Sequence, residues 1–201
     1  MQQQVQQAIC ILPWRRAALP VARWLACAFL CSCILLPFAQ AAPDTRPTQY
    51  EVEAAYLFDF GKFIAWPAAS ADTPFVICVL GQDPFGAILD RTVAGESLRG
   101  RQVQDRRIAH PQDAPGCSIL YISSSESPRL NKILSTLQGA PVLTVSDIPD
   151  FVQQGGMIQF VLRDGRVRFA VNLAPAQSSG LSMSSELLKV AVEVRRAGGS
   201  Q

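Results

Sequence analysis

Hydrophobic residues in the middle of this chain gather in short unbroken runs that alternate with stretches of helical spacing. The runs Phe75–Leu80 and Ser118–Ile122 are almost wholly apolar and rich in β-branched residues, a pattern typical of strands buried on both faces. The segments that follow them predict two helices, then a short strand and a short helix, at residues 82–93, 127–138, 141–145 and 147–153. This alternation predicts an α/β fold, a single domain with a mixed, largely parallel sheet flanked by helices.

The pattern changes at Met157 to two alternating runs around Asp164-Gly165, a dipeptide that favours the two-residue turn of a β-hairpin. Such a turn pairs Arg163 directly with Arg166 and places Arg168 on the same face. Like charges opposite each other destabilise a hairpin unless water or an anion compensates them. The arginine face is therefore interpreted either as a solvated surface or as a patch that contacts an anionic ligand or partner.

Amphipathic helices are predicted at the two ends of this region, over residues 50–66 and 181–196. The first helix ends at Pro67 and carries apolar side chains on more than one face, so it needs burial on two sides. It is either a central core helix or a helix whose second apolar face contacts another protein. In the second case the contact would be made by its aromatic residues, Tyr56, Phe60, Phe63 and Trp66.

Residues 1–41 have the features of a secretory signal peptide. Three arginines precede or begin an apolar stretch, and Ala39-Gln40-Ala41 supplies the small residues that a signal peptidase requires. The uninterrupted apolar stretch, residues 24–36, is shorter than the roughly 20 residues of a membrane-spanning helix. We therefore expect cleavage after Ala41 and an exported protein that does not itself span the membrane. The parts expected after the leader are a flexible tail over 42–49, a domain over 50–196 and a disordered tail over 197–201.

The charge balance argues against a nucleic-acid-binding protein. The leader holds three of the 18 basic residues and none of the 16 acidic ones, so the rest carries 15 basic and 16 acidic side chains. Proteins that bind nucleic acid need a basic stripe that displaces the counterions of the phosphates. No nucleic-acid partner is expected.

The cysteine pattern predicts one disulfide in the exported chain. Four of the six cysteines lie in the leader, so only Cys78 and Cys117 remain. Two cysteines in an oxidising compartment favour a disulfide, which would stabilise the fold by about 4 kcal/mol through closure of its loop. A metal or redox pair is the alternative, and it is weaker because the sequence has no Cys-x-x-Cys motif and His110 is its only histidine.

Motifs for catalysis are sparse. The sequence contains no P-loop, no metal-ligand cluster and no Gly-x-Ser-x-Gly motif. Ser123, Ser124 and Ser125 follow a predicted strand, where α/β enzymes often place their active sites, but neither an acid nor a base can be assigned to them. We expect a protein that is not an enzyme and has no metal and no cofactor, with an exported hydrolase that uses these serines as a remote alternative.

Short segments spread over the chain form a combined pattern of residues. They are Glu53–Leu57, Phe63–Pro67, Cys78 with Gly81, Gly100-Arg101, Cys117, Gly155–Ile158, Arg168–Leu173 and Leu187–Ala191. Together these segments resemble the YfiR family of periplasmic regulators, and the resemblance covers about residues 50–195.

The resemblance implies a periplasmic protein that binds the sensor portion of an inner-membrane GGDEF-type diguanylate cyclase and represses it, which lowers cyclic di-GMP and biofilm formation. It also implies a homodimer. Cys78 and Cys117 match the core cysteine pair of the family, but the second pair of some relatives is absent, which favours a structural bridge over a thiol sensor. The alternative function is a binding module for a small anion or aromatic compound.

Overall fold

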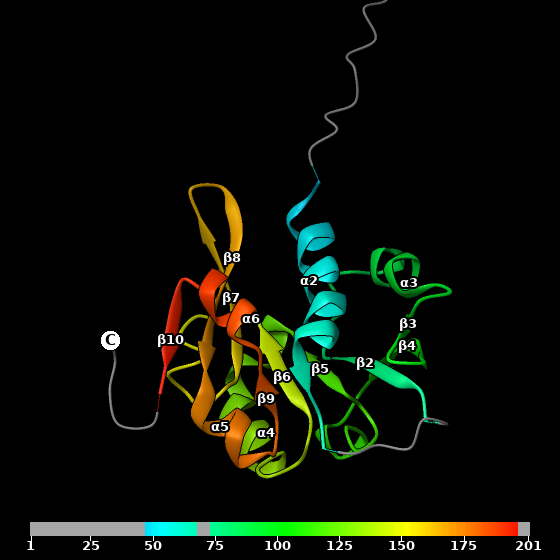
Figure 1. Ribbon diagram of the computed structural model, residues 1–201. Coiled ribbons are helices and arrows are strands. Elements are labelled where there is room, and N and C mark those ends of the chain that lie inside the picture. Colours follow the sequence, from blue (N-terminus) through cyan, green and yellow to red (C-terminus); the bar gives the residue numbers. More distant parts are fainter. Residues whose placement is uncertain (1–46, 68–72, 197–201) are drawn as a thin grey trace, which may run out of the picture. The chain divides into compact units, whose positions relative to one another are not determined.

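The structure, a computed structural model, describes residues 47–67 and 73–196. The expected signal peptide over residues 1–41 and the expected tail over 197–201 lie outside the described residues. An eight-stranded sheet with the strand order β10-β8-β7-β6-β5-β2-β4-β3 forms the centre of the fold (Figure 1). Its strands are β2 (Phe75–Leu80), β3 (Ser97–Leu98), β4 (Arg101–Ile108), β5 (Ile119–Ile122), β6 (Leu143–Ser146), β7 (Ile158–Arg163), β8 (Arg166–Asn172) and β10 (Glu193–Arg195). This arrangement confirms the predicted α/β fold.

The five strands in the middle of the sheet, β4, β2, β5, β6 and β7, all run parallel. Only β8, paired with β7, and β3, paired with β4, are antiparallel to their inner neighbours, while β10 runs parallel to β8. Parallel neighbours need crossover connections, which pass over the faces of the sheet. The crossover segments include α3 (Ala87–Val93), α4 (Leu130–Thr136) and the 3-10 turns Pro111–Asp113 and Ser124–Arg129.

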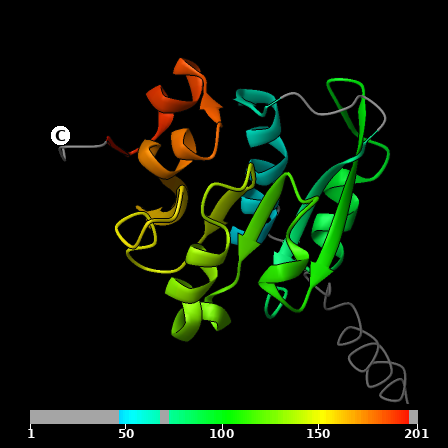
Figure 2. The same ribbon diagram turned by 90° about the horizontal axis from the view of Figure 1, so that it is seen from below.

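The two faces of the sheet bury separate apolar clusters, because the side chains of a strand alternate between its faces. In β2, Phe75, Ile77 and Val79 join the cluster that includes Leu57 and Phe60 of α2 (Gln49–Phe63). The alternate residues Val76, Cys78 and Leu80 join the cluster that includes Leu130 and Ile133 of α4. Figure 2 shows α4 on the side of the sheet away from α2. We call these the α2 face and the disulfide face.

Helix α2 is the central core helix of the α2 face. It begins one residue earlier than expected, because the Thr48 hydroxyl accepts a hydrogen bond from the Glu51 N–H and the Glu51 carboxylate accepts one from the Thr48 N–H. Phe60 is fully buried and packs against Phe160 and Phe169, with ring centroids 5.9 and 5.3 Å away. The proposal that Phe60 forms part of a partner surface is therefore wrong: its ring is committed to the core.

The hairpin has the predicted register. Arg163 lies opposite Arg166, and the pairs Leu162 with Val167 and Phe160 with Phe169, on the other face of the hairpin, follow from the two-residue turn. The turn residue Asp164 has φ 51° and Gly165 has φ 68°, the left-handed conformations that such a turn requires.

The end of the chain differs from the single helix predicted over residues 181–196. It is divided into β9 (Ser182–Met183), α6 (Ser185–Val190) and β10 (Glu193–Arg195). Strand β9 pairs with β1 (Ile64–Ala65) in a separate two-stranded sheet. The helix is short because the segment after Val190 pairs with β8, and backbone pairing with an existing sheet overrides helical spacing.

Three other predicted helices are also shorter or absent. The helix predicted over residues 82–93 begins only at Ala87, and the one predicted over residues 127–138 divides into a 3-10 turn and α4. Residues 147–153 form turns in place of a helix. Pro84, Pro128 and Pro149 lie in or before these regions, and proline removes a backbone donor that an α-helix needs.

The predicted disulfide between Cys78 and Cys117 is confirmed. Cys78 lies within β2 and Cys117 lies two residues before β5, with 5.9 Å between their Cα atoms. The Arg106 guanidinium covers the bridge, with Nη2 3.3 Å from the Cys117 sulfur and 3.1 Å from the Asp113 carbonyl oxygen. The bridge thus joins two neighbouring parallel strands on the disulfide face, and the described residues contain no cluster of three or more metal-binding side chains.

Candidate functional site

Two hollows border α2, one near each end of the helix. The larger one, about 860 Å³, lies between the first turns of α2 and the tip of the β7–β8 hairpin. Figure 1 shows the hairpin and the start of α2 rising beyond the rest of the sheet. We call this hollow and its rim the hairpin site. Its lining residues are Pro47, Gln49, Val52, Tyr56, Leu162, Asp164, Gly165, Arg166, Val167 and Arg168.

The floor of the hairpin site is aromatic and rigid. Tyr56 lies with its ring 5.5 Å from that of Phe169 and 6.1 Å from that of Phe160, and it is only partly buried. Helix α2 places it there because Tyr56 lies one turn before Phe60, on the edge of the buried face. The contacts with Phe160 and Phe169 therefore hold the Tyr56 ring in a fixed position at the floor of the site.

The rim of the hairpin site is positively charged and uncompensated. Arg163, Arg166 and Arg168 are exposed, and none of them forms an ion pair or side-chain hydrogen bond within residues 47–67 and 73–196. Arg107 shows the contrast, since it bonds to Asp83 at 2.8 Å, to Asp90 at 2.7 Å and also to Asp105. The hairpin arginines therefore keep their full capacity to bind an anionic group.

Exposed apolar side chains also gather at the hairpin. Leu162 at its tip is 62% exposed, and Val190 at the end of α6 is 61% exposed. Val190 lines a second hollow of about 390 Å³ on the outer side of the hairpin, which it shares with Arg163, Arg166 and Arg168. Apolar residues beside free arginines are a composition typical of protein interfaces.

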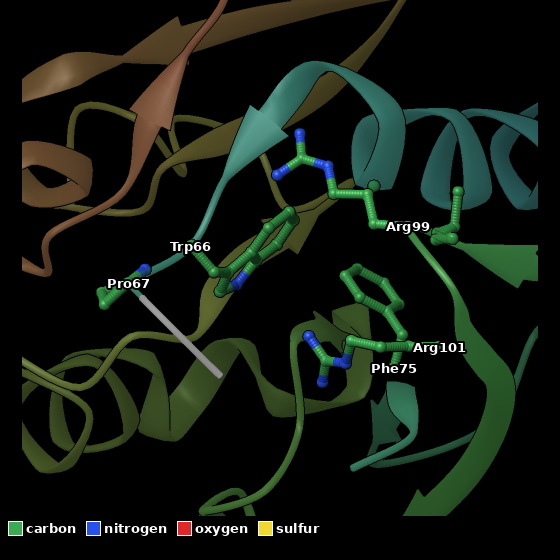
Figure 3. A pocket seen from close by; sticks show the side chains of 7 residues that line it. Trp66, Pro67, Phe75, Arg99 and Arg101 are labelled. Atoms are coloured by element: carbon green, nitrogen blue, oxygen red, sulfur yellow. The ribbon is translucent and has the colours of Figure 1, made fainter. Parts of the chain in front are cut away.

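The other hollow lies at the end of α2 around Trp66 and encloses about 180 Å³. Figure 3 shows Arg99 and Arg101 pointing toward the Trp66 indole from two sides, with the Phe75 ring beside it. The indole N–H donates to the Ser118 carbonyl oxygen at 3.1 Å, and the Trp66 and Phe75 rings meet edge to face at 5.0 Å. We call this the Trp66 hollow; the sequence pointed to no site role for Arg99, and to Arg101 only as part of the family pattern.

Both arginines of the Trp66 hollow have structural tasks. Arg99 lies in the turn between β3 and β4 with φ 52°, and its Nη2 donates to the Ile64 carbonyl at 3.0 Å, just past the end of α2. Arg101 donates to the Thr73 and Pro74 carbonyls at 2.7 Å each. A positive charge at the C-terminal end of a helix is stabilising, so the hollow also anchors α2.

A buried carboxyl group lies beneath α2. Glu53 is fully buried, and its Oε1 accepts a hydrogen bond of 2.8 Å from Gln49, whereas Oε2 has no described partner. Burial and the nearby Asp147 raise the pKa of Glu53 to about 7, although the Gln49 hydrogen bond opposes the rise. Burial, followed by the charges of Asp147 and Glu53, also raises the pKa values of Tyr50 and Tyr121. The cluster that Glu53 forms with Tyr121 and Asp147 lies at the carboxyl ends of β5 and β6. None of the hollows described above opens onto this cluster.

The serines considered for catalysis take part in local turns. The Ser123 hydroxyl caps the following 3-10 turn by accepting from the Ser125 N–H, and Ser125 Oγ accepts a 2.9 Å hydrogen bond from the Gln82 N–H. The first bond is local to the loop after β5, and the second ties that loop to the loop after β2. The hydrogen bonds assign these side chains a structural task.

The structure thus brings together only some of the residues predicted as a surface. Tyr56, Arg166 and Arg168 line one hollow, and Arg163 lies on its outer side. Trp66 lies at the other end of α2, and Phe63, 41% exposed, is on the last turn of the same helix. The sequence alone could not show this division, because it depends on which end of α2 packs beside the hairpin.

Comparison with solved structures finds a conserved domain protein from Vibrio cholerae O1 biovar El Tor strain N16961. The TM-score is 0.46 at 11% identity, and the alignment covers 60% of this chain and 54% of that one. This chain therefore matches about half the length of that protein, and the similarity is too weak to assign a function. Within residues 47–67 and 73–196, no helix has the length and apolar character that crossing a bilayer requires.

The sequence itself matches a known family over most of its length. A family model described as YfiR/HmsC-like matches residues 50–192, which include α2, the disulfide, the hairpin and α6. The disulfide fits the oxidising compartment in which this family acts. The chain belongs to the YfiR/HmsC-like family.

Proposed function

We propose that this protein is a periplasmic repressor that binds the periplasmic sensor portion of an inner-membrane GGDEF-type diguanylate cyclase, lowering cyclic di-GMP and biofilm formation. Family membership supports the class of function, since the family is one of periplasmic regulators. The observation that carries the proposal is the hairpin site, where three arginines that form no ion pair with any described residue surround exposed apolar residues. We further propose that the leader is removed on export and that the protein is a homodimer that binds no nucleic acid.

The hairpin site suits a protein partner better than a small molecule. It is open and wide, its aromatic floor is held by the core, and its rim offers guanidinium groups. Tyrosine and arginine are enriched among the residues that contribute most to protein–protein binding, because each combines a large contact area with directed hydrogen bonds. A partner surface with carboxylates around an apolar centre would complement it.

Repression requires only that the protein prefer one state of the cyclase. A ligand shifts a two-state equilibrium by its difference in affinity for the two states. A difference of about 3 kcal/mol changes the ratio of active to inactive cyclase more than a hundredfold. Binding without catalysis is thus sufficient for the proposed role.

The proposal is tested by deleting the gene and measuring cyclic di-GMP and surface attachment, with and without the cyclase gene. We expect both quantities to rise in the single deletion and to fall back in the double deletion. Complementation with Arg166→Glu should fail, whereas Lys132→Glu, an equal charge reversal on α4 on the disulfide face, should restore repression. Unchanged cyclic di-GMP in the single deletion, while the cyclase is being made, would refute the proposed function.

A second candidate function is binding of a small aromatic anion in the Trp66 hollow. The observation that favours it is the pairing of two aromatic rings with Arg99 and Arg101, with no carboxylate among the described residues that line the hollow. Calorimetric titration with aromatic carboxylates, compared between the native protein and Arg101→Gln, tests it. Equal heats for both proteins would eliminate the hollow as a ligand site.

A further inference from the structure

The outer edge of the hairpin is an unpaired strand. Strand β8 is paired with β7 along its whole length, but on its other side β10 reaches only Ala170–Asn172. One more hydrogen bond, from the Val192 N–H to the Phe169 carbonyl oxygen at 2.9 Å, extends this contact by one residue. Among the described residues, nothing pairs with the outer edge of β8 from Arg166 to Arg168.

The backbone groups on this edge can be assigned from the register. Residues flanking a two-residue turn exchange both hydrogen bonds, so Arg166 and Arg168 direct their N–H and C=O groups toward β7. Val167 and Phe169 must then direct theirs outward, and the Val192 bond to Phe169 agrees with this alternation. The Val167 N–H and C=O are therefore a free donor and acceptor on an open strand edge.

The surroundings of this edge select the chemistry of an incoming strand. The outer hollow of about 390 Å³ runs beside it and is lined by Val190 and Val192, by the turn residue Asp164, and by Arg163, Arg166 and Arg168. Three positive charges against the single negative charge of Asp164 favour carboxylates on the added segment. They disfavour a second copy of this chain paired hairpin to hairpin, because that would place six arginines together.

We propose that an extended, acidic segment of the cyclase's periplasmic portion adds as a strand to the outer edge of β8, in continuation of β10. This inference rests on the proposed function and specifies how the partner is held. Backbone hydrogen bonds to Val167 would supply affinity, while carboxylates over Arg166 and Arg168 would supply selectivity. A strand added here also covers an edge that is otherwise protected only by its arginines.

The test is residue-resolved amide hydrogen exchange of the mature protein, free and bound to the purified periplasmic portion of the cyclase. We expect the Val167 amide to exchange rapidly in the free protein and to slow by about tenfold or more in the complex. The Arg168 amide is the internal control, since it already bonds to β7 and should change much less. Arg166→Glu should weaken the complex by about tenfold, and Lys132→Glu should leave it unchanged.

The other outcomes separate this inference from the proposed function. A complex that forms, and is weakened by Arg166→Glu, but leaves Val167 exchange unaltered would overturn strand addition and keep the repressor role. Slowing of Val167 that depends on the concentration of this protein alone would identify a second copy as the occupant and overturn the inference as stated. Absence of any complex with the folded protein would overturn both.

Discussion

The two faces of the sheet are stabilised in different ways, although the same strands contribute to both. On the α2 face a helix from the start of the domain packs on β7 and β8, and the aromatic contacts join residues about a hundred positions apart, such as Phe60 with Phe160. On the disulfide face the cover consists of α4 and short turns, Phe151 is the only aromatic ring in the cluster among the described residues, and Cys78 is bonded to Cys117. Long-range aromatic packing holds one face, whereas a covalent bond supports the other.

The contrast predicts that the α2 face is most sensitive to loss of a single ring. Phe60→Ala should lower the free energy of unfolding by about 4 kcal/mol, because it leaves a cavity between α2 and the hairpin strands. Urea denaturation followed by circular dichroism measures the change. Phe63→Ala on the same helix is the control, and a loss equal to that of Phe60→Ala would show that burial does not decide the effect.

Loss of the disulfide should lower the free energy of unfolding somewhat less than Phe60→Ala does. Replacing both Cys78 and Cys117 by alanine should lower the free energy of unfolding by about 3 kcal/mol, because the unfolded chain loses a loop constraint spanning 39 residues and a disulfide usually contributes somewhat less than its loop-closure value of about 4 kcal/mol. A reducing agent should destabilise the native protein to a similar degree and leave the double variant unaffected. Insensitivity of the native protein to reduction would contradict this account of the face.

The stability contributed by the α2 face should also depend on pH, because the Glu53 carboxyl group is buried there. The folded-state pKa of Glu53 is about 7, above the ordinary value of 4.5, so the folded protein binds this proton more tightly than the unfolded chain. The Glu53 contribution to stability is therefore fully present below about pH 4.5 and is lost as the pH rises through about 7, at a cost of about 3 kcal/mol. Glu53→Gln should remove most of this slope, as measured by urea denaturation between pH 5 and 8, and an unchanged slope would assign it to other groups.

The smallest expected effect is at Trp66, which links the α2 face to the disulfide face. Trp66 follows α2, and its indole N–H bonds to the carbonyl of Ser118, the residue next to Cys117. Trp66→Phe keeps a ring beside Phe75 but removes this hydrogen bond, and should cost about 1 kcal/mol. Combining it with the cysteine replacements in a double-mutant cycle measures whether the two regions are coupled, and purely additive losses would show that they are independent.

Local patterns predicted the parts of the fold whose structure is decided locally. The buried β-branched runs correctly predicted strands β2 and β5. Asp164-Gly165 correctly predicted the hairpin register, because a two-residue turn and the two-residue period of a strand allow only one pairing. Residues 191–196 were misassigned to a helix, since their pairing with β8 depends on a strand that is distant along the sequence. Secondary-structure propensities depend on local sequence and carry no information about such a partner.

The candidate site was predictable to a similar extent. The hairpin arginines followed from the register, whereas the position of Tyr56 beside them and the burial of Phe60 required the packing of α2. Neither Arg99 nor Arg101 could be assigned to a site from the sequence, because each occurs in a short turn or at a strand start, where charged residues are ordinary. Only the structure shows that both point toward Trp66.

The position of Trp66 has a spectroscopic consequence. The three tryptophans of the sequence are Trp14, Trp24 and Trp66, and the first two lie in the leader, so processed protein would fluoresce from Trp66 alone. Trp66 and Cys117 line one common hollow of about 620 Å³, and a disulfide close to an indole quenches its emission. Reduction of the bridge should brighten the protein before any unfolding, which would let one intrinsic signal follow the oxidation state of the disulfide in real time.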